Sequence, residues 1–358
     1  MSTELHAVVP VVVCLVGLVT VVIVALAVAL VKGGPKQPVP LGSINEPFKS
    51  VDTSDLPPAE HFTARDNTAL AYRHYAVRPA LVRGSAVLIH GSSASGVSMH
   101  TLAKALAASG YNVYVPDMRG HGDSGRKGTI AYIGQLEDDL GDFLDAVQPD
   151  GPRTLVGFSA GGGFALRFAS DARQLAFDRY VLLAPFIHQN APTTPPAVGG
   201  WANLGIPRVV ALTFLNALRI TLFNHLPVVA FALAPEAAAR LTPRYSYNLM
   251  QNFRPHHNYR ADIRATRRPL DVLVGANDEA FHADAFAGVF EEAGRVVPVT
   301  IVPEVGHIGL TLEPLAVATI VAAVFERGSE AVFIDDRSPR RRIRSSPHGR
   351  QSGALEQR

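Results

Sequence analysis

The chain has little of several features that would narrow its class. Its 358 residues include one cysteine, Cys14, so no disulfide can form within the chain. No group of cysteines and histidines has the spacing of a zinc site, and no internal repeat is present. The net charge is +2, which gives no support for binding nucleic acid. What remains is a chain long enough to bury a large core, with additional segments at its ends.

Charge is missing altogether from residues 7–31, which form an apolar run. At about 1.5 Å per residue, a helix of this length crosses a hydrocarbon core of about 30 Å. No lysine or arginine precedes the run, and it is longer than the apolar region of a usual secretory signal, which has about 7–15 residues. We therefore predict an uncleaved, single-pass membrane anchor over residues 1–32, with a long cleaved signal as the alternative. Lys32 and Lys36 follow the run and weakly favour a cytoplasmic catalytic domain.

Two segments lack the periodicity of helices or strands. Residues 33–58 are rich in proline, glycine and serine, which predicts a linker between the anchor and a globular domain. Residues 328–358 form a basic tail, with seven arginines and one glutamate from Arg337 onward. We predict that the tail is disordered. The alternative is that its arginines bind anionic lipid headgroups.

The middle of the chain alternates between short apolar runs and amphipathic helical patterns. A hairpin with its turn at Asp66-Asn67 is predicted first, and runs such as "SAVLIHG" and "YVLLAP" then alternate with helices. Strands that are apolar throughout are typical of a mostly parallel sheet with helices on both faces. We predict this α/β core over residues 59–187 and 266–327. Functional residues in such folds gather at the carboxyl ends of the strands.

A serine that is suited to nucleophilic catalysis lies at the end of one such strand. Ser159 follows the strand "TLVGF" and precedes a helix, within the pattern Gly157-x-Ser-x-Gly161. Two glycines leave room for a tight, strained turn that exposes a hydroxyl beside a helix N-terminus. We predict that Ser159 is a nucleophile. A glycine-rich turn without a catalytic role is the simpler alternative.

Two further residues at strand ends complete a catalytic triad. His307, in "PEVGHIGL", follows the last predicted strand and is the predicted base. Asp278 follows the preceding strand and is the predicted carboxylate that orients the histidine, although it could instead cap a helix. Asp284 and Asp271 are poorer candidates because they fall within a predicted helix and a predicted strand.

An oxyanion hole would need two backbone N–H groups near the serine. Ala160, next to the nucleophile, is predicted to supply one of them. The loop 88–96, "LIHGSSASG", follows the first parallel strand and would supply the other from Ser92. The side chains of Ser92, Ser93 and Ser95 are expected to serve the geometry of the turn and not catalysis.

The order of serine, acid and histidine, each after a strand, resembles the α/β-hydrolase superfamily. The stretch "PDMRGHGDSG" (116–125) is similar to one found in lysophospholipase and monoacylglycerol-lipase-like members, a group that borders the serine aminopeptidases. The resemblance covers about residues 60–327. It implies an eight-stranded core with Ser159, Asp278 and His307 as the triad. It also implies that residues 117–124 support the site without a catalytic role.

The resemblance further implies a cap inserted between two strands, which we place at residues 188–265. Its stretch 206–235 is strongly apolar, but polar residues interrupt it too often for a second membrane span. We predict amphipathic cap helices whose apolar faces line an acyl pocket or rest on the membrane. His256 and His257 lack a carboxylate partner at suitable spacing, so no metal site is predicted.

The sequence therefore predicts a membrane-anchored serine hydrolase. Its expected substrate is a carboxylic ester with an acyl chain, of the monoacylglycerol or lysophospholipid type, and no cofactor or metal is expected. Its expected partners are this small substrate and the membrane, not nucleic acid. An amidase or peptidase with the same triad is the first alternative. The second is a non-catalytic membrane scaffold on the hydrolase fold.

Overall fold

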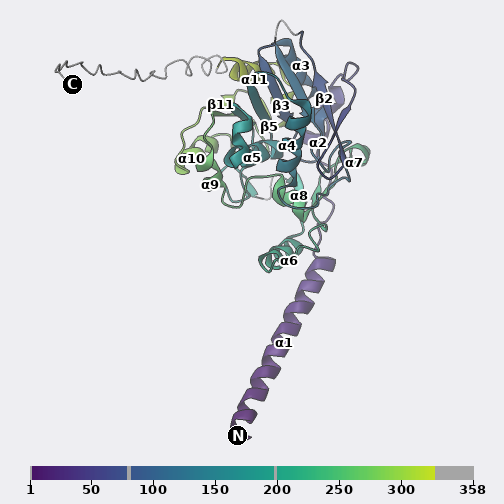
Figure 1. The fold of residues 1–358 in the computed structure, drawn as a ribbon, viewed down its shortest axis with the longest axis vertical. Helices are drawn as coiled ribbons and strands as arrows, with labels where there is room; N and C mark the ends of the chain where they lie inside the picture. Colours follow the sequence, from purple (N-terminus) through teal and green to yellow (C-terminus); the bar gives the residue numbers. More distant parts are fainter. Residues whose placement is uncertain (1, 79–81, 197–199, 327–358) are drawn as a thin grey trace, which may run out of the picture.

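An eight-stranded sheet forms the centre of the molecule (Figure 1). The computed structural model describes residues 2–78, 82–196 and 200–326. Strands from β4 to β11 in the sheet order pair in parallel, and β1 and β2 pair antiparallel at one edge. The strands in sheet order are β1 (Glu60–Thr63), β2 (Ala69–Tyr75), β4 (Tyr111–Pro116), β3 (Gly84–Ile89), β5 (Arg153–Phe158), β6 (Arg179–Leu183), β10 (Leu270–Gly275) and β11 (Val299–Val302). The predicted mostly parallel sheet and its opening hairpin are confirmed.

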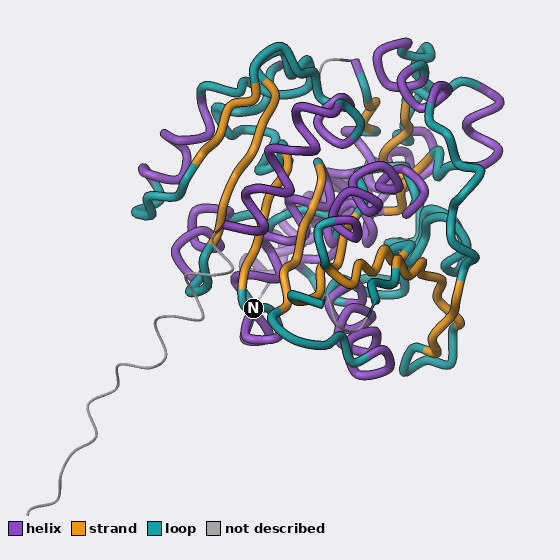
Figure 2. Tube along the Cα trace, turned by 90° about the horizontal axis from the view of Figure 1, so that it is seen from above, coloured by secondary structure: helices purple, strands orange, loops and turns teal. Residues whose placement is uncertain are grey.

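Helices cover both faces of the sheet (Figure 2). Every residue of β3, β6 and β10 is buried, and because side chains alternate between faces, full burial requires cover on both sides. Helix α11 packs on α3, whereas α5 packs against β5 and β6. The helices of the core are α3 (His100–Ala108), α4 (Gln135–Val147), α5 (Ala160–Ser170), α10 (Ala285–Glu292) and α11 (Pro314–Glu326).

The segment predicted to be the cap, residues 188–265, lies between β6 and β10 and contains a small sheet as well as helices. It is called the cap below. Its antiparallel sheet has the order β7-β8-β9. Residues 206–235, expected as amphipathic helices, are helical only in part. The cap elements are β7 (Ala202–Leu204), α6 (Ile206–Ala217), β8 (Pro227–Phe231), α7 (Pro235–Arg240), β9 (Arg244–Ser246), α8 (Tyr247–Asn252) and α9 (Tyr259–Ala265).

The strand in this apolar stretch has a local cause. Arg219 has a φ of +62°, a left-handed conformation that ends the helical turn after α6. Pro227 cannot continue a helix, and it is followed by the β-branched residues Val228 and Val229, which favour a strand. Residues 228–231 are buried, as expected for an apolar stretch, but they form a strand. The prediction of a helix over residues 227–231 was therefore wrong.

Helix α1 (Ser2–Lys32) projects from the globular part as a single rod (Figure 1). Its segment Val12–Lys32 is long and apolar enough to cross a membrane and is not buried by the rest of the chain. The C-terminal end of α1 meets α6 of the cap. Here Arg208 donates hydrogen bonds from Nε to the Leu30 carbonyl (2.8 Å) and from Nη2 to the Val31 carbonyl (3.1 Å). An arginine thus satisfies carbonyl groups that the end of a helix leaves without partners.

The segment after α1 continues through two short helices, α2 (Gly42–Asn45) and the 3-10 helix η1 (Pro47–Ser50), before β1 begins. The remaining 3-10 helices are η3 (Gly96–Met99), η4 (Ala172–Ala176) and η6 (Ile308–Thr311). The basic tail predicted at residues 328–358 lies outside the described residues.

Candidate active site

Ser159 occupies a strained turn between β5 and α5. Its φ of +54° and ψ of −117° are unusual for a residue with a side chain. A Cβ added at Gly157 would lie 2.2 Å from the Gly161 carbonyl oxygen, and one added at Gly161 would lie 2.4 Å from the His90 carbonyl oxygen. Both flanking glycines are therefore required by the close approach of backbone to backbone. The turn places the serine at the carboxyl end of the central strand.

The structure brings His307 and Asp278 to Ser159. His307 follows β11, and its Nε2 lies 3.1 Å from the Ser159 Oγ. Asp278 follows β10, and its Oδ2 lies 2.8 Å from the His307 Nδ1. The side chain of Asp278 has no exposed surface, and Ser159 and His307 are also buried. Hydroxyl, imidazole and carboxylate thus form a continuous hydrogen-bonded chain away from bulk water.

Neighbouring groups hold this chain in place. The other oxygen of Asp278 accepts hydrogen bonds from the N–H groups of Ala280 and Phe281, both at 2.8 Å. The backbone N–H of His307 donates to Glu279 Oε2 at 2.9 Å. Asp278 therefore stabilises a turn and contacts the imidazole at the same time. It does not cap a helix, the alternative weighed from the sequence, because the next helix begins only at Ala285. The contact from Glu279 was not predicted.

The weaker acidic candidates lie elsewhere. Asp271, in β10, forms a buried ion pair with Arg179. Asp284 is exposed at the N-terminal end of α10. Only Asp278, of the three acids considered, has a hydrogen bond to His307 among the described residues.

The two candidate oxyanion donors flank Ser159. A Cβ added at Gly91 would lie 3.3 Å from the Ser159 Cβ, so the loop after β3 passes directly beside the serine. Within the described residues, the N–H of Ser92 in this loop has no hydrogen-bond acceptor. Ala160 is the first residue of α5, where an N–H has no acceptor within the helix. Neither N–H therefore has an acceptor among the described residues, as a candidate oxyanion donor requires.

Residues of the cap support the Ser92 loop. The Tyr245 hydroxyl accepts a hydrogen bond from the Ser93 N–H at 2.6 Å, and the Ser93 hydroxyl donates to the Thr242 carbonyl at 2.7 Å. Trp201 donates from Nε1 to the Ser92 hydroxyl oxygen at 3.1 Å. These cap residues were not predicted. They follow Ser92 and Ser93 by more than a hundred positions, and no local pattern in the sequence marks them.

Two buried histidines link the loop to the stretch 116–125. His121 Nε2 lies 2.6 Å from the Tyr245 hydroxyl, and His90 Nε2 accepts the Met118 N–H at 3.1 Å. Burial lowers the pKa of both imidazoles, so they are neutral. A neutral His121 that donates from Nδ1 to the Met118 carbonyl accepts at Nε2, which leaves Tyr245 to donate its hydroxyl proton. The stretch thus supports the site without touching Ser159.

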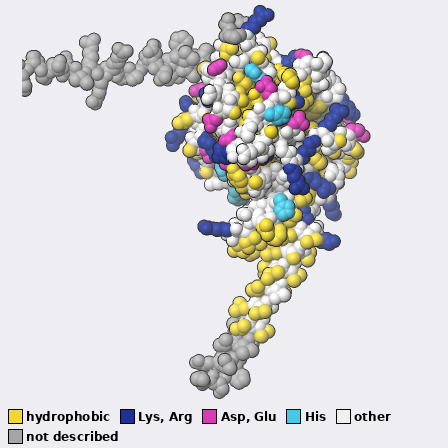
Figure 3. Space-filling model, turned by 45° about the vertical axis from the view of Figure 1, so that its right-hand side comes forward, with side chains coloured by type: hydrophobic (Ala, Val, Ile, Leu, Met, Phe, Trp, Pro, Cys, Tyr) yellow, Lys and Arg dark blue, Asp and Glu magenta, His cyan; other side chains and the backbone are white. Residues whose placement is uncertain are grey.

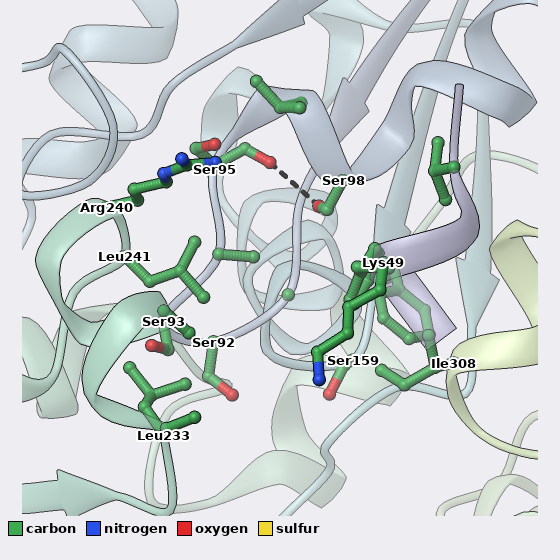
Figure 4. Close-up of a pocket in the computed structure, with 18 of the residues that line it drawn as sticks. Lys49, Ser92, Ser93, Ser95, Ser98, Ser159, Leu233, Arg240, Leu241 and Ile308 are labelled. Carbon is green, nitrogen blue, oxygen red and sulfur yellow. Dashed lines mark hydrogen bonds between the residues drawn. The ribbon is translucent and has the colours of Figure 1, made fainter. Parts of the chain in front are cut away.

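A cavity of about 450 Å³ opens above Ser159 (Figure 4). Its walls come from the Ser92 loop, the segment after α1, the cap and the loop that carries His307. The volume lies within the range of about 300–1,000 Å³ that is usual for small-molecule sites. The apolar lining residues are Phe48, Val51, Ala94, Val97, Phe158, Trp201, Leu233, Ala234, Ala237, Leu241 and Ile308.

No group of three or more histidine, cysteine or acidic side chains that could hold a metal ion is found among the described residues. The expectation that His256 lacks a carboxylate partner was wrong, because its Nδ1 pairs with Asp262 at 2.9 Å across a turn before α9. The ring of His257 packs against that of His188.

A sequence profile of the family described as serine aminopeptidase, S33, matches residues 81–314 of this chain. A curated monoacylglycerol lipase of Mycolicibacterium smegmatis is 33% identical over 130 residues, which cover 34% of this chain and 45% of that lipase. The chain spans less than half the length of the curated relatives that it matches.

Solved structures show the same fold at low sequence identity. A soluble variant of monoglyceride lipase from Saccharomyces cerevisiae, in complex with a substrate analog, matches with a TM-score of 0.58 and 17% identity, covering 78% of this chain and 98% of that one. A monoacylglycerol lipase of Paleococcus ferrophilus matches with a TM-score of 0.54 and 19% identity, covering 73% of this chain and 98% of that one.

Proposed function

The chain belongs to the serine aminopeptidase S33 family of α/β hydrolases, and on that premise we propose that it is a membrane-anchored serine hydrolase of lipid-like carboxylic esters. The hydrogen-bonded chain from Ser159 Oγ through His307 to Asp278 carries this proposal. Its position at the floor of a largely apolar cavity supports an ester with an acyl chain, of the monoacylglycerol or lysophospholipid type.

The geometry suits acyl transfer in two steps. Ser159 attacks the ester carbonyl as His307 Nε2 takes the hydroxyl proton, and Asp278 stabilises the imidazolium at Nδ1. The N–H groups of Ser92 and Ala160 donate to the oxyanion, a contact worth about 3 kcal/mol of barrier for each donor. His307 then gives its proton to the leaving alcohol. Water repeats the sequence on the acyl-enzyme, releasing the acid and restoring Ser159.

The cavity favours an ester over a peptide. A site that binds the free amine of a peptide would need carboxylates, and Glu236 is the one acidic residue in the described lining. An amidase or peptidase with the same triad remains the alternative. A non-catalytic scaffold is disfavoured, because all three triad positions carry reactive side chains in contact.

The membrane part of the proposal is supported by α1 and α6 together. Arg208 fixes the start of α6 to the last carbonyls of α1, so the apolar face of α6 adjoins the end of the apolar helix. Hydrophobic side chains continue from α1 onto the adjoining part of the globular domain (Figure 3). An exposed apolar face of this kind suits burial in the interfacial region of a bilayer. The exposed apolar residues of α6 and the turn after it are Ile206, Val210, Phe214, Leu218, Ile220 and Leu222.

The test uses a fluorophosphonate probe and p-nitrophenyl esters of increasing chain length on the full chain in detergent. We expect the probe to label the wild type and not Ser159→Ala, and octanoyl esters to be cleaved faster than acetyl esters. Labelling that persists in Ser159→Ala would refute the nucleophile. A preference for acetyl esters would refute the lipid-like substrate.

A further inference from the structure

The segment between α1 and the core, residues 33–55, is called the strap here. Its first half is attached to the cap. The Lys36 N–H donates to Asn203 Oδ1 at 2.8 Å, the Gln37 side chain donates to the Phe231 carbonyl at 2.8 Å, and the Leu41 N–H donates to the Ala232 carbonyl at 3.0 Å. These bonds join the strap to the sheet of the cap.

The far end of the strap is attached to the core. Asp55 lies 3.0 Å from His100 Nε2 and 2.5 Å from Lys104 Nζ, both on α3. The Lys104 ammonium and the His100 ring lower the pKa of the Asp55 carboxyl, which keeps it charged. His100 is buried, and its other ring nitrogen lies 2.8 Å from the Tyr75 hydroxyl. The strap is thus held at both ends, by the cap and by α3.

Between these attachments the strap lines the cavity above Ser159. In Figure 4, Lys49 of the strap lies on one side of the cavity, and Leu241 and Arg240 of the cap lie on the other. The strap residue Phe48 is half-buried and packs against the hydrophobic core. The strap residues in the lining are Phe48, Lys49, Val51 and Thr53.

We propose that the strap is a specificity-determining wall of the active site, and that Phe48 and Val51 contact the acyl chain of the ester. This inference rests on the proposed hydrolase function. Phe48 and Val51 present apolar surface to a cavity whose floor is Ser159, and the strap continues without interruption from α1. The segment that connects the enzyme to its anchor therefore also selects the substrate. Asp55 is a positioning residue that holds this wall in place.

The first test compares Phe48→Ala with Phe223→Ala in the full chain. Both phenylalanines are half-buried against the core, but Phe223 does not line the cavity. One apolar group in a binding pocket changes selectivity by about tenfold or more. We therefore expect the ratio of kcat/KM for octanoyl over acetyl p-nitrophenyl ester to fall about tenfold in Phe48→Ala. The ratio should not change in Phe223→Ala.

The second test compares Asp55→Ala with Asp52→Ala, which covers the case that Phe48→Ala does not fold. Asp52 is also an exposed acid of the strap, but its hydrogen bonds are to the nearby Ser54 and not to α3. Asp55→Ala should release the wall from α3 and shift the octanoyl-to-acetyl ratio by about threefold or more, with fluorophosphonate labelling retained. Asp52→Ala should keep the wild-type ratio.

The outcomes separate this inference from the function on which it rests. If Ser159 is labelled normally and the ratio is unchanged in Asp55→Ala and in folded Phe48→Ala, the strap does not select the substrate and the inference is overturned. If the wild type is not labelled at all, the hydrolase proposal fails first.

Discussion

Two regions meet at Ser159, and they are built in different ways. The catalytic edge consists of turns that directly follow β3, β5, β10 and β11, and backbone groups hold its side chains. The opposite wall consists of the strap and the cap. Side chains join the strap to the cap and to α3, and the cap to the Ser92 loop, across long stretches of sequence. The chemistry thus depends on the sheet, whereas the shape of the cavity depends on segments near the membrane anchor. Changes to the first region, or to the cap residues that hold its loops, should affect rate. Changes to the residues of the second region that line the cavity should affect selectivity.

Among the variants considered, Asp278→Asn should lower kcat the most, and it tests whether the catalytic edge controls the rate. Asparagine keeps an oxygen for the N–H groups of Ala280 and Phe281, so the turn should remain folded. It cannot stabilise an imidazolium, and we expect kcat for a p-nitrophenyl ester to fall about 10⁴-fold. The exposed Asp284→Asn is the matched control and should stay within about twofold, as surface substitutions usually do. A loss below tenfold in Asp278→Asn would contradict the triad.

Tyr245→Phe should have a smaller effect, because it acts on the oxyanion loop through the cap. It leaves the buried Ser93 N–H and His121 Nε2 without their shared partner. A buried group left unpaired costs about 1–3 kcal/mol, so both the free energy of unfolding and the position of Ser92 should suffer. We expect kcat to fall about tenfold to a hundredfold, which is less than the loss of about 10²–10³ caused by removing an oxyanion donor itself, because Tyr245 acts only through the loop. Tyr132→Phe, which removes an exposed hydroxyl bonded to Asp138, is the control. Equal kcat in both variants would show that the cap does not position the loop.

The catalytic edge could be predicted from the sequence, whereas the contacts of the strap and the cap could not. The positions of Ser159, Asp278 and His307 are local facts, since each follows an apolar strand, and a parallel sheet brings strand ends together. The β8 strand was missed because its apolar run also fits a helix. Trp201, Tyr245 and the attachments of the strap were missed because they are contacts between distant segments. No periodicity records such contacts, and a segment rich in proline and glycine gives no sign of what it packs against.

A labelling experiment tests whether the exposed apolar face of α6 contacts lipid. Cys14 is the only cysteine, so Val210→Cys in a Cys14→Ser background carries one fluorophore on the exposed apolar face of α6. In vesicles, lipids with a quencher on the acyl chain should reduce its fluorescence. Ser54→Cys, an exposed strap position, should be quenched several-fold less. Equal quenching at both positions would place α6 away from the acyl region.

The smallest effect is expected on the free energy of unfolding, at the junction of the two regions. There, residues 186–188 connect the central sheet to the cap. The Phe186 N–H donates to the Ser159 carbonyl at 3.0 Å, and His188 lies just beyond it. Burial, with Arg254 and His257 nearby, lowers the pKa of His188 from 6.5 to about 4. Because the unfolded chain then binds a proton more readily, stability from this group is complete above pH 6.5 and is lost as the pH falls toward 4.

His188→Asn should remove this dependence, because asparagine does not bind a proton in this pH range. The local fold should be kept, since asparagine can still accept the Asn190 N–H that bonds to His188 Nδ1. The change is bounded, since one group contributes at most about 1.4 kcal/mol per pH unit. Denaturant unfolding of the full chain in detergent, followed between pH 6.5 and 4, should give a shallower loss of unfolding free energy in His188→Asn than in the wild type. The exposed His61→Asn should match the wild type. If His188→Asn also shows the wild-type loss of unfolding free energy, acid destabilises the protein through other groups. Protonation of His188 then does not weaken the junction between the catalytic edge and the cap.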